Sequence, residues 1–150
     1  MAKLNGLSIQ LLVSRVLISL IFIIGTLWKM THHEMLCASM NLHHVPFVSV
    51  FSYCSVLIEL ICGFGMLLGI KTKYAAYLCF FYMVIITWFY HIAPMSQVDI
   101  LSITFSLLIK NLAIMGGLLS LASAGGGEYS LDYMLANKSL RPLKMTIPVS

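Results

Sequence analysis

The chain has 150 residues, which is the length of one domain, but its composition is not that of a water-soluble protein. Apolar residues make up 60% of the chain and charged residues only 9%, whereas a typical soluble domain has ~25% charged residues. So few charges cannot cover a water-exposed surface. This excludes an ordinary soluble enzyme, a nucleic-acid-binding protein with a basic face, and a disordered protein, and it predicts a small integral membrane protein.

Four apolar runs are each long enough to cross a bilayer, which takes ~20 helical residues. The first contains Arg15 and no cleavage site of small residues follows it, so we expect a retained helix and not a signal peptide. The predicted fold is an all-α, four-helix transmembrane bundle in a single domain. The runs cover about residues 9–28, 47–70, 74–92 and 100–124, and residues 125–150 form a polar tail that is expected to fray beyond Leu135.

Only the connection between the first two runs, residues 30–46, is long enough to have structure of its own. Methionine and leucine recur there at helical spacing, which predicts a short helix lying at the membrane interface. The same segment holds four histidines and Cys37, which are copper or zinc ligands by type. Their spacing fits no standard metal site, so no metal is expected.

The basic residues predict the orientation of the bundle. Six of them fall at one end of the four helices and only Lys29 at the other, which by the positive-inside rule places both termini in the cytoplasm. The expected location is the inner membrane, crossed several times. The six are Lys3, Lys71, Lys73, Lys138, Arg141 and Lys144.

At least three ionisable residues lie inside the predicted spans, where each costs ~2.5–3.5 kcal/mol at a helix centre. At ~1.5 Å per residue, Glu59 lies ~15 Å from the cytoplasmic end, Arg15 ~9 Å from the same end, and Lys110 ~16 Å from the outer end. All three come within side-chain reach of one level. Glu59 is therefore expected to pair with Arg15, Lys110 or both, and Asn111 could lend an amide to the same network.

Two interpretations of this network remain open. It can be a salt-bridge network that only fixes helix packing, or a buried site for a ligand or a proton, which intramembrane ionisable residues often mark. His91, at the outer end of the third run, could turn toward the outer loop. Cys62 and Cys79 lie in apolar runs and no CxxC pair is present, so both are expected to be small apolar filler.

A set of short segments recurs in a recognisable order along the chain. The segments are Ser14-Arg15, Phe22-Ile23-Ile24-Gly25, Lys29, Glu59-Leu60-Ile61-Cys62-Gly63, residues 68–76, residues 110–119 and residues 125–132. This ordered set resembles the DoxX-like family of small four-helix membrane proteins. Cys62-Gly63 departs from the doubled glycine that normally follows the glutamate in this family.

The resemblance implies a small subunit that works with a quinone, because the family takes its name from a subunit of a quinol-oxidising or thiosulfate:quinone complex. Many members have no assigned activity. The chain has no flavin, haem or iron–sulfur motif, so it is at most a subunit of a membrane oxidoreductase and electrons would come from a redox partner protein. The alternatives are a non-catalytic scaffold or assembly factor and, more weakly, a transporter of a small solute or metal.

The expected surroundings are the lipid bilayer and, in some assemblies, further copies of the chain; no nucleic-acid partner is expected. The candidate ligand, a quinone headgroup, needs hydrogen-bond donors and a proton path at a dry site. The residues proposed to supply them are Arg15, Glu59, Lys110, Asn111 and His91.

Overall fold

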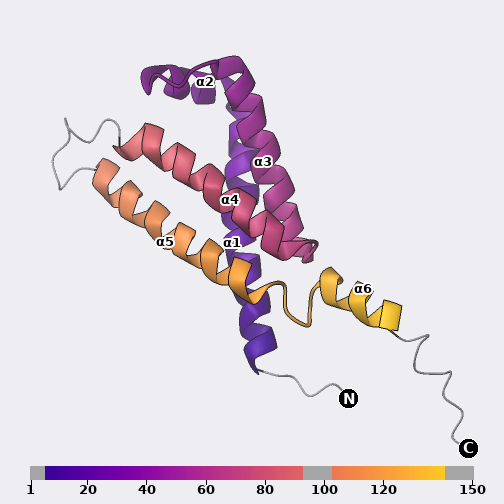
Figure 1. Ribbon diagram of the computed structural model, residues 1–150. Coiled ribbons are helices and arrows are strands. Elements are labelled where there is room, and N and C mark those ends of the chain that lie inside the picture. The colour runs from indigo at the N-terminus through magenta and orange to yellow at the C-terminus, as the bar shows by residue number, and fades with distance from the viewer. Residues whose placement is uncertain (1–5, 93–102, 141–150) are drawn as a thin grey trace, which may run out of the picture.

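The computed structural model describes residues 6–92 and 103–140, and every regular element in this part of the chain is a helix (Figure 1). Four spans are long and apolar enough to cross a membrane. Their bounds agree with the four predicted runs to within a few residues, so the all-helical architecture is confirmed. The elements are α1 (Gly6–Thr31), α2 (His33–Leu42), α3 (Val48–Leu68), α4 (Thr72–Thr87) with its π-helical continuation η1 (Trp88–Ile92), α5 (Ile103–Ala124) and α6 (Leu131–Leu140).

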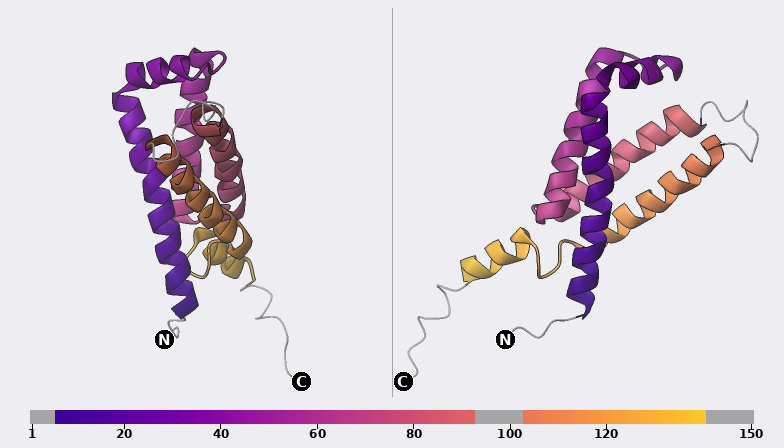
Figure 2. Two further views of the ribbon diagram at one scale, coloured as in Figure 1. Left: turned by 90° about the vertical axis from the view of Figure 1, so that its left-hand side faces the viewer. Right: turned by 180° about the vertical axis from the view of Figure 1, so that it is seen from behind.

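The four spans are arranged as two pairs. α1 and α3 run side by side, and α4 and α5 run side by side at an inclination to the first pair (Figures 1 and 2). Gly63 allows the close approach within the first pair, because a Cβ atom there would lie 2.9 Å from Cγ1 of Ile23. Gly117 does the same where α5 meets α1, at 3.2 Å from Ile18. Small residues at helix contacts are typical of bundles in lipid.

The turn between α3 and α4 is tight and closed by hydrogen bonds. Gly69 ends α3 in the left-handed region at φ 73°, and the amide of Ile70 donates to the carbonyl of Gly65 at 2.9 Å, which is how glycine-terminated helices satisfy their last carbonyls. The first amides of α4, those of Lys71 and Thr72, donate to the carboxylate of Asp132 at 2.8 and 3.0 Å. The start of α4 is therefore capped by a residue from α6.

The bundle buries polar side chains and exposes apolar ones, the reverse of a soluble protein. Arg15, Thr26 and Glu59 are buried, while large aliphatic and aromatic side chains point outward along all four spans. A bilayer requires this distribution, because polar groups in contact with lipid are costly.

Two segments outside the spans have definite structure. α2 lies across the end of the bundle at which α1 ends and α3 begins, and it buries Leu36 and Met40. The predicted helix in residues 30–46 therefore does form (Figure 1). The prediction of a tail that frays beyond Leu135 is wrong, because α6 continues to Leu140. Contacts to the spans hold the tail: Asp132 of α6 accepts from the amides of Lys71 and Thr72, and the Ser8 hydroxyl donates to Glu128 in the loop before α6 at 2.8 Å.

Candidate buried polar site

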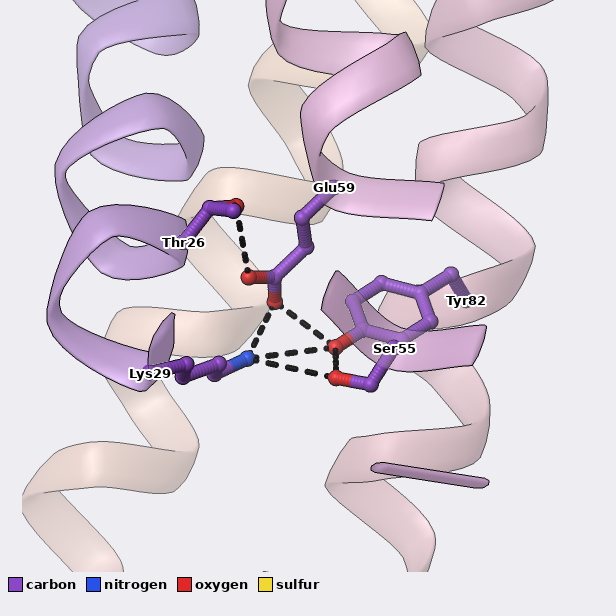
Figure 3. A network of polar contacts seen from close by, with 5 residues as sticks. All are labelled: Thr26, Lys29, Ser55, Glu59 and Tyr82. Atoms are coloured by element: carbon purple, nitrogen blue, oxygen red, sulfur yellow. Dashed lines mark hydrogen bonds and ion pairs between the residues drawn. The ribbon is translucent and has the colours of Figure 1, made fainter. Parts of the chain in front are cut away.

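A carboxylate in the middle of α3 is the centre of a polar network that joins three helices. Glu59 is 5% exposed. Its Oε1 forms an ion pair with Nζ of Lys29 at 2.5 Å and accepts a hydrogen bond from the Tyr82 hydroxyl at 2.7 Å. Its Oε2 accepts a hydrogen bond from Thr26 at 3.3 Å (Figure 3). Both carboxylate oxygens are thus bonded, as a charged group inside a membrane protein requires.

Helical spacing explains how the side chains converge. Thr26 and Lys29 are three residues apart on α1, and Ser55 and Glu59 are four apart on α3, so each pair shares one face of its helix. Tyr82 reaches in from α4. The network therefore depends on the packing of α1, α3 and α4 against one another.

A second set of contacts extends the network beyond the carboxylate. The hydroxyls of Ser55 and Tyr82 are 2.6 Å apart. The Lys29 ammonium donates to Tyr82 Oη at 3.2 Å and to Ser55 Oγ at 3.5 Å (Figure 3). Hydroxyl groups both donate and accept hydrogen bonds, so Ser55, Tyr82 and Glu59 form a continuous hydrogen-bonded chain.

The network opens on one side to a cleft between α1 and α5. Its volume is about 650 Å³, and most of its lining is aliphatic, from residues such as Ile18 and Ile114. The polar lining consists of Lys29, Glu59, Lys110 and Asn111. The amide of Asn111 is oriented by a hydrogen bond to the Thr87 hydroxyl at 3.2 Å. The cleft thus presents charged and amide groups to a space that is otherwise apolar.

The observed geometry corrects the sequence-based prediction of which residues pair with Glu59. The sequence-based pairing with Arg15 is wrong, because Arg15 is buried in the N-terminal half of α1, where it donates to the carbonyls of Gly126 and Tyr129 at 2.7 and 2.8 Å. The Glu59 ion pair is with Lys29. Lys110 lines the same cleft as Glu59, but the ion pair seen among the described residues is not with it.

The pairing with Arg15 was predicted wrongly because α1 and α3 are offset along their axes. The depth arithmetic placed Arg15 within side-chain reach of Glu59, whereas Thr26 and Lys29 are the residues of α1 that bond Glu59. Arg15 lies eleven positions before Thr26, about 16 Å along the helix. Thr26 and Lys29 are three residues apart and share one face of their helix, which is a usable signal in the sequence, but nothing in the sequence identified Tyr82 or Ser55.

His91 lies in η1, outside the Glu59 network and outside the set of residues that line the cleft. Its Nδ1 atom is buried and has no hydrogen-bond partner among the described residues. π-Helical turns such as η1 are uncommon and occur often near functional sites. The structure therefore brings Glu59, Lys110 and Asn111 to one cleft, and leaves Arg15 and His91 apart from it.

Three of the four histidines in residues 30–46 lie against aromatic rings; they are His32, His33 and His43. The ring of His32 stacks on Trp28, with centroids 4.9 Å apart, and His33 lies against Tyr53 at 4.6 Å. Within residues 6–92 and 103–140, no three side chains of the metal-binding types gather into one group.

The comparison with protein families decides the classification. A model of the DoxX family matches residues 10–92 of the chain, more than half of its length. The chain belongs to the DoxX family. The matched stretch runs from α1 to η1, so it contains the whole Glu59 network of this DoxX chain, while Lys110 and Asn111 lie beyond it on α5. Comparison with curated proteins and with solved structures gave no match.

Proposed function

We propose that this DoxX chain is a small membrane subunit that binds a quinone headgroup in the cleft between α1 and α5 and assists quinone-linked electron transfer. The observation that carries the proposal is the cleft itself, where Glu59 and Lys110 face a mainly aliphatic space. Its volume of about 650 Å³ lies within the range of small-molecule sites, ~300–1,000 Å³. A quinone has matching chemistry, with two carbonyl oxygens on an apolar ring and tail.

Each polar group in the cleft has a role in this proposal. The ammonium groups of Lys29 and Lys110 and the amide of Asn111 donate hydrogen bonds to the quinone oxygens, and such bonds are strongest where a donor is charged. Glu59 exchanges protons with the reduced headgroup, and the Tyr82 hydroxyl continues the proton path away from the cleft. Electrons come from a redox partner protein.

A scaffold or assembly factor is the competing function, and one observation favours it. Glu59 already has both oxygens bonded within the chain, and Arg15 holds the loop before α6 by two charged hydrogen bonds. Contacts of this kind also occur in networks that only fix helix packing. The scaffold function predicts that the cleft binds no quinone.

The orientation and the location belong to the same proposal. The start of α1 and helix α6 lie at one end of the bundle (Figure 1), and we propose that this end faces the cytoplasm, with the chain in the inner membrane. Lys71 and Lys73 lie in the turn and first residues of α4 at that end, as the positive-inside rule requires.

Titration of the purified protein with a quinone tests the proposal. The protein in quinone-free nanodiscs is titrated with decylubiquinone while tryptophan fluorescence is recorded. Lys110→Met removes a charged donor from the cleft and should weaken binding about tenfold or more, because a hydrogen bond from a charged group contributes ~1.5–3 kcal/mol. Lys73→Met, at the opposite end of the bundle, is the matched control and should bind as the unaltered protein does. Equal binding by both variants, or no binding at all, would contradict the proposal.

A further inference from the structure

A second pocket lies at the end of the bundle where the start of α4 and the end of α5 meet α6 (Figure 1). Its volume is about 490 Å³, and two lysines from the start of α4 line it. The membrane spans end at this level, α3 at Leu68 and α5 at Ala124. The pocket therefore lies where the polar headgroups of lipids meet the protein. Its lining includes Lys71, Lys73, Tyr74, Ser130, Asp132 and Tyr133.

The two lysines of this pocket are not neutralised within the part of the chain that the structure describes. Neither Lys71 nor Lys73 forms an ion pair with a described residue, and both side chains are exposed. The acid in the lining is Asp132, and its carboxylate is already bonded to the backbone amides of Lys71 and Thr72 at 2.8 and 3.0 Å. With respect to the described residues, both ammonium groups are therefore available to an anion.

The loop that follows α5 holds one of these lysines in place. Gly125 adopts the left-handed region at φ 77°, and a Cβ atom there would lie 3.2 Å from Cε of Lys73. The stem of Lys73 is therefore packed against the loop, and its ammonium is one bond beyond Cε. The buried guanidinium of Arg15 donates to the carbonyl of Gly126 in the same loop at 2.7 Å. A third positive charge thus lies behind the loop that lines the pocket.

An apolar groove adjoins the pocket on the surface of the spans. The groove lies between α3 and α4 and has a volume of about 390 Å³, and Lys71 and Tyr74 line both the groove and the pocket. It extends from the turn to Ile61, ~10 Å along α3 from the end of that helix. The charged pocket and the groove are therefore continuous. The side chains from the spans that line the groove are mainly large, apolar and exposed, and they include Ile61, Phe64, Leu68 and Leu78.

We propose that the pocket and the groove together bind an anionic phospholipid, with its phosphate at Lys71 and Lys73 and one acyl chain in the groove. Basic pockets between membrane helices are known to bind anionic headgroups. A free phosphate would use the lysines alone, whereas a phospholipid uses both spaces, so their continuity favours the lipid. Neither space shares a lining residue with the cleft between α1 and α5. The inference is therefore independent of the proposed function.

Native mass spectrometry of the delipidated protein in detergent tests this site, because it counts bound lipids. The protein is titrated separately with dioleoyl phosphatidylglycerol and with dioleoyl phosphatidylcholine, and inorganic phosphate is then added to the first complex. We expect one phosphatidylglycerol to bind per chain, about tenfold or more tightly than phosphatidylcholine, because two lysines attract the anionic lipid. Inorganic phosphate should not displace it, since phosphate cannot fill the groove. Equal binding of the two lipids, or displacement by millimolar phosphate, would overturn the inference.

Single substitutions assign the binding to the pocket. Lys71→Gln and Lys73→Gln each remove one charge and should weaken phosphatidylglycerol binding about fivefold, the effect of one lysine near an anionic lipid. Lys138→Gln is the matched control, because Lys138 lies on α6 at the same end of the bundle but does not line the pocket. This variant should bind as the unaltered protein does, and equal losses in all three variants would contradict the proposed site.

Added salt provides a second test, which needs no variant and decides the question if a lysine variant fails to fold. Salt screens the attraction between exposed charges. Binding of phosphatidylglycerol by the unaltered protein should therefore weaken as sodium chloride is raised. Binding that does not depend on salt would overturn the assignment of the phosphate to the two lysines.

Discussion

Glu59→Gln isolates the electrostatic part of the buried network. The substitution keeps the shape of the side chain and retains an oxygen that accepts from Lys29 and Tyr82. The amide nitrogen then faces Thr26, whose hydroxyl can accept a hydrogen bond as readily as it donates one. The hydrogen bonds are therefore preserved and the change removes the negative charge, which leaves the Lys29 ammonium without its counter-ion.

The expected cost follows from the burial of the two partners. Breaking a buried ion pair from one side costs ~3–5 kcal/mol. The side chain of Lys29 is 19% exposed and that of Glu59 is 7% exposed, so the ammonium regains part of its solvation. We expect the lower bound, about 3 kcal/mol, which corresponds to a fall of roughly 10 °C in the midpoint of thermal unfolding.

Thermal unfolding of the purified variants in detergent measures this loss. Adding Lys29→Met to Glu59→Gln removes the unpaired cation and should restore most of the stability, because the two residues form one interaction. Adding Lys110→Met instead is the matched control, since Lys110 lines the same cleft, and should restore none. Rescue by Lys110→Met equal to that by Lys29→Met would refute the pairing of Glu59 with Lys29.

Three further outcomes are expected. Arg15→Lys should destabilise the bundle by about 1.5–3 kcal/mol and speed proteolysis within α6, because one ammonium cannot reproduce the two hydrogen bonds made by the buried guanidinium. In a cysteine-free background, an impermeant thiol reagent added to intact cells should label Ala38→Cys and not Asn137→Cys; the opposite pattern would reverse the orientation. The metal content of the protein, measured by mass spectrometry, should be unchanged when four histidines are replaced by alanine, and a stoichiometric metal lost in that variant would contradict this. The four are His32, His33, His43 and His44.

The spans were predictable because their signal is local. An apolar run of about 20 residues with few charges is a membrane helix whatever it packs against, and the four predicted runs agree with α1, α3, α4 with η1, and α5. The helix α2 was predictable for the same reason, from apolar residues at helical spacing. The structure of the tail was not predictable from local signals, because α6 is held by contacts with residues far away in the chain. One of them is the Asp132 carboxylate, which caps α4.

Which residues pair with Glu59 inside the bundle cannot be predicted from local signals of this kind. Sequence identified Glu59 as a buried acid, but it assigned Arg15, Lys110 or both as its partners, because depth was counted from assumed helix ends. The structure brings Thr26 level with Glu59. The offset between α1 and α3 depends on how Gly63 packs against Ile23, which is a contact between segments far apart in the chain.

The amino-acid sequence by itself therefore determined that this protein is a four-helix membrane bundle with an acid buried in its second span, because hydropathy and charge act residue by residue. Only the tertiary structure decided which cation meets that acid and that Tyr82 completes the network. These contacts depend on the register and the crossing of the helices. Register and crossing arise from packing between helices, so the sequence pattern of a single helix does not predict them.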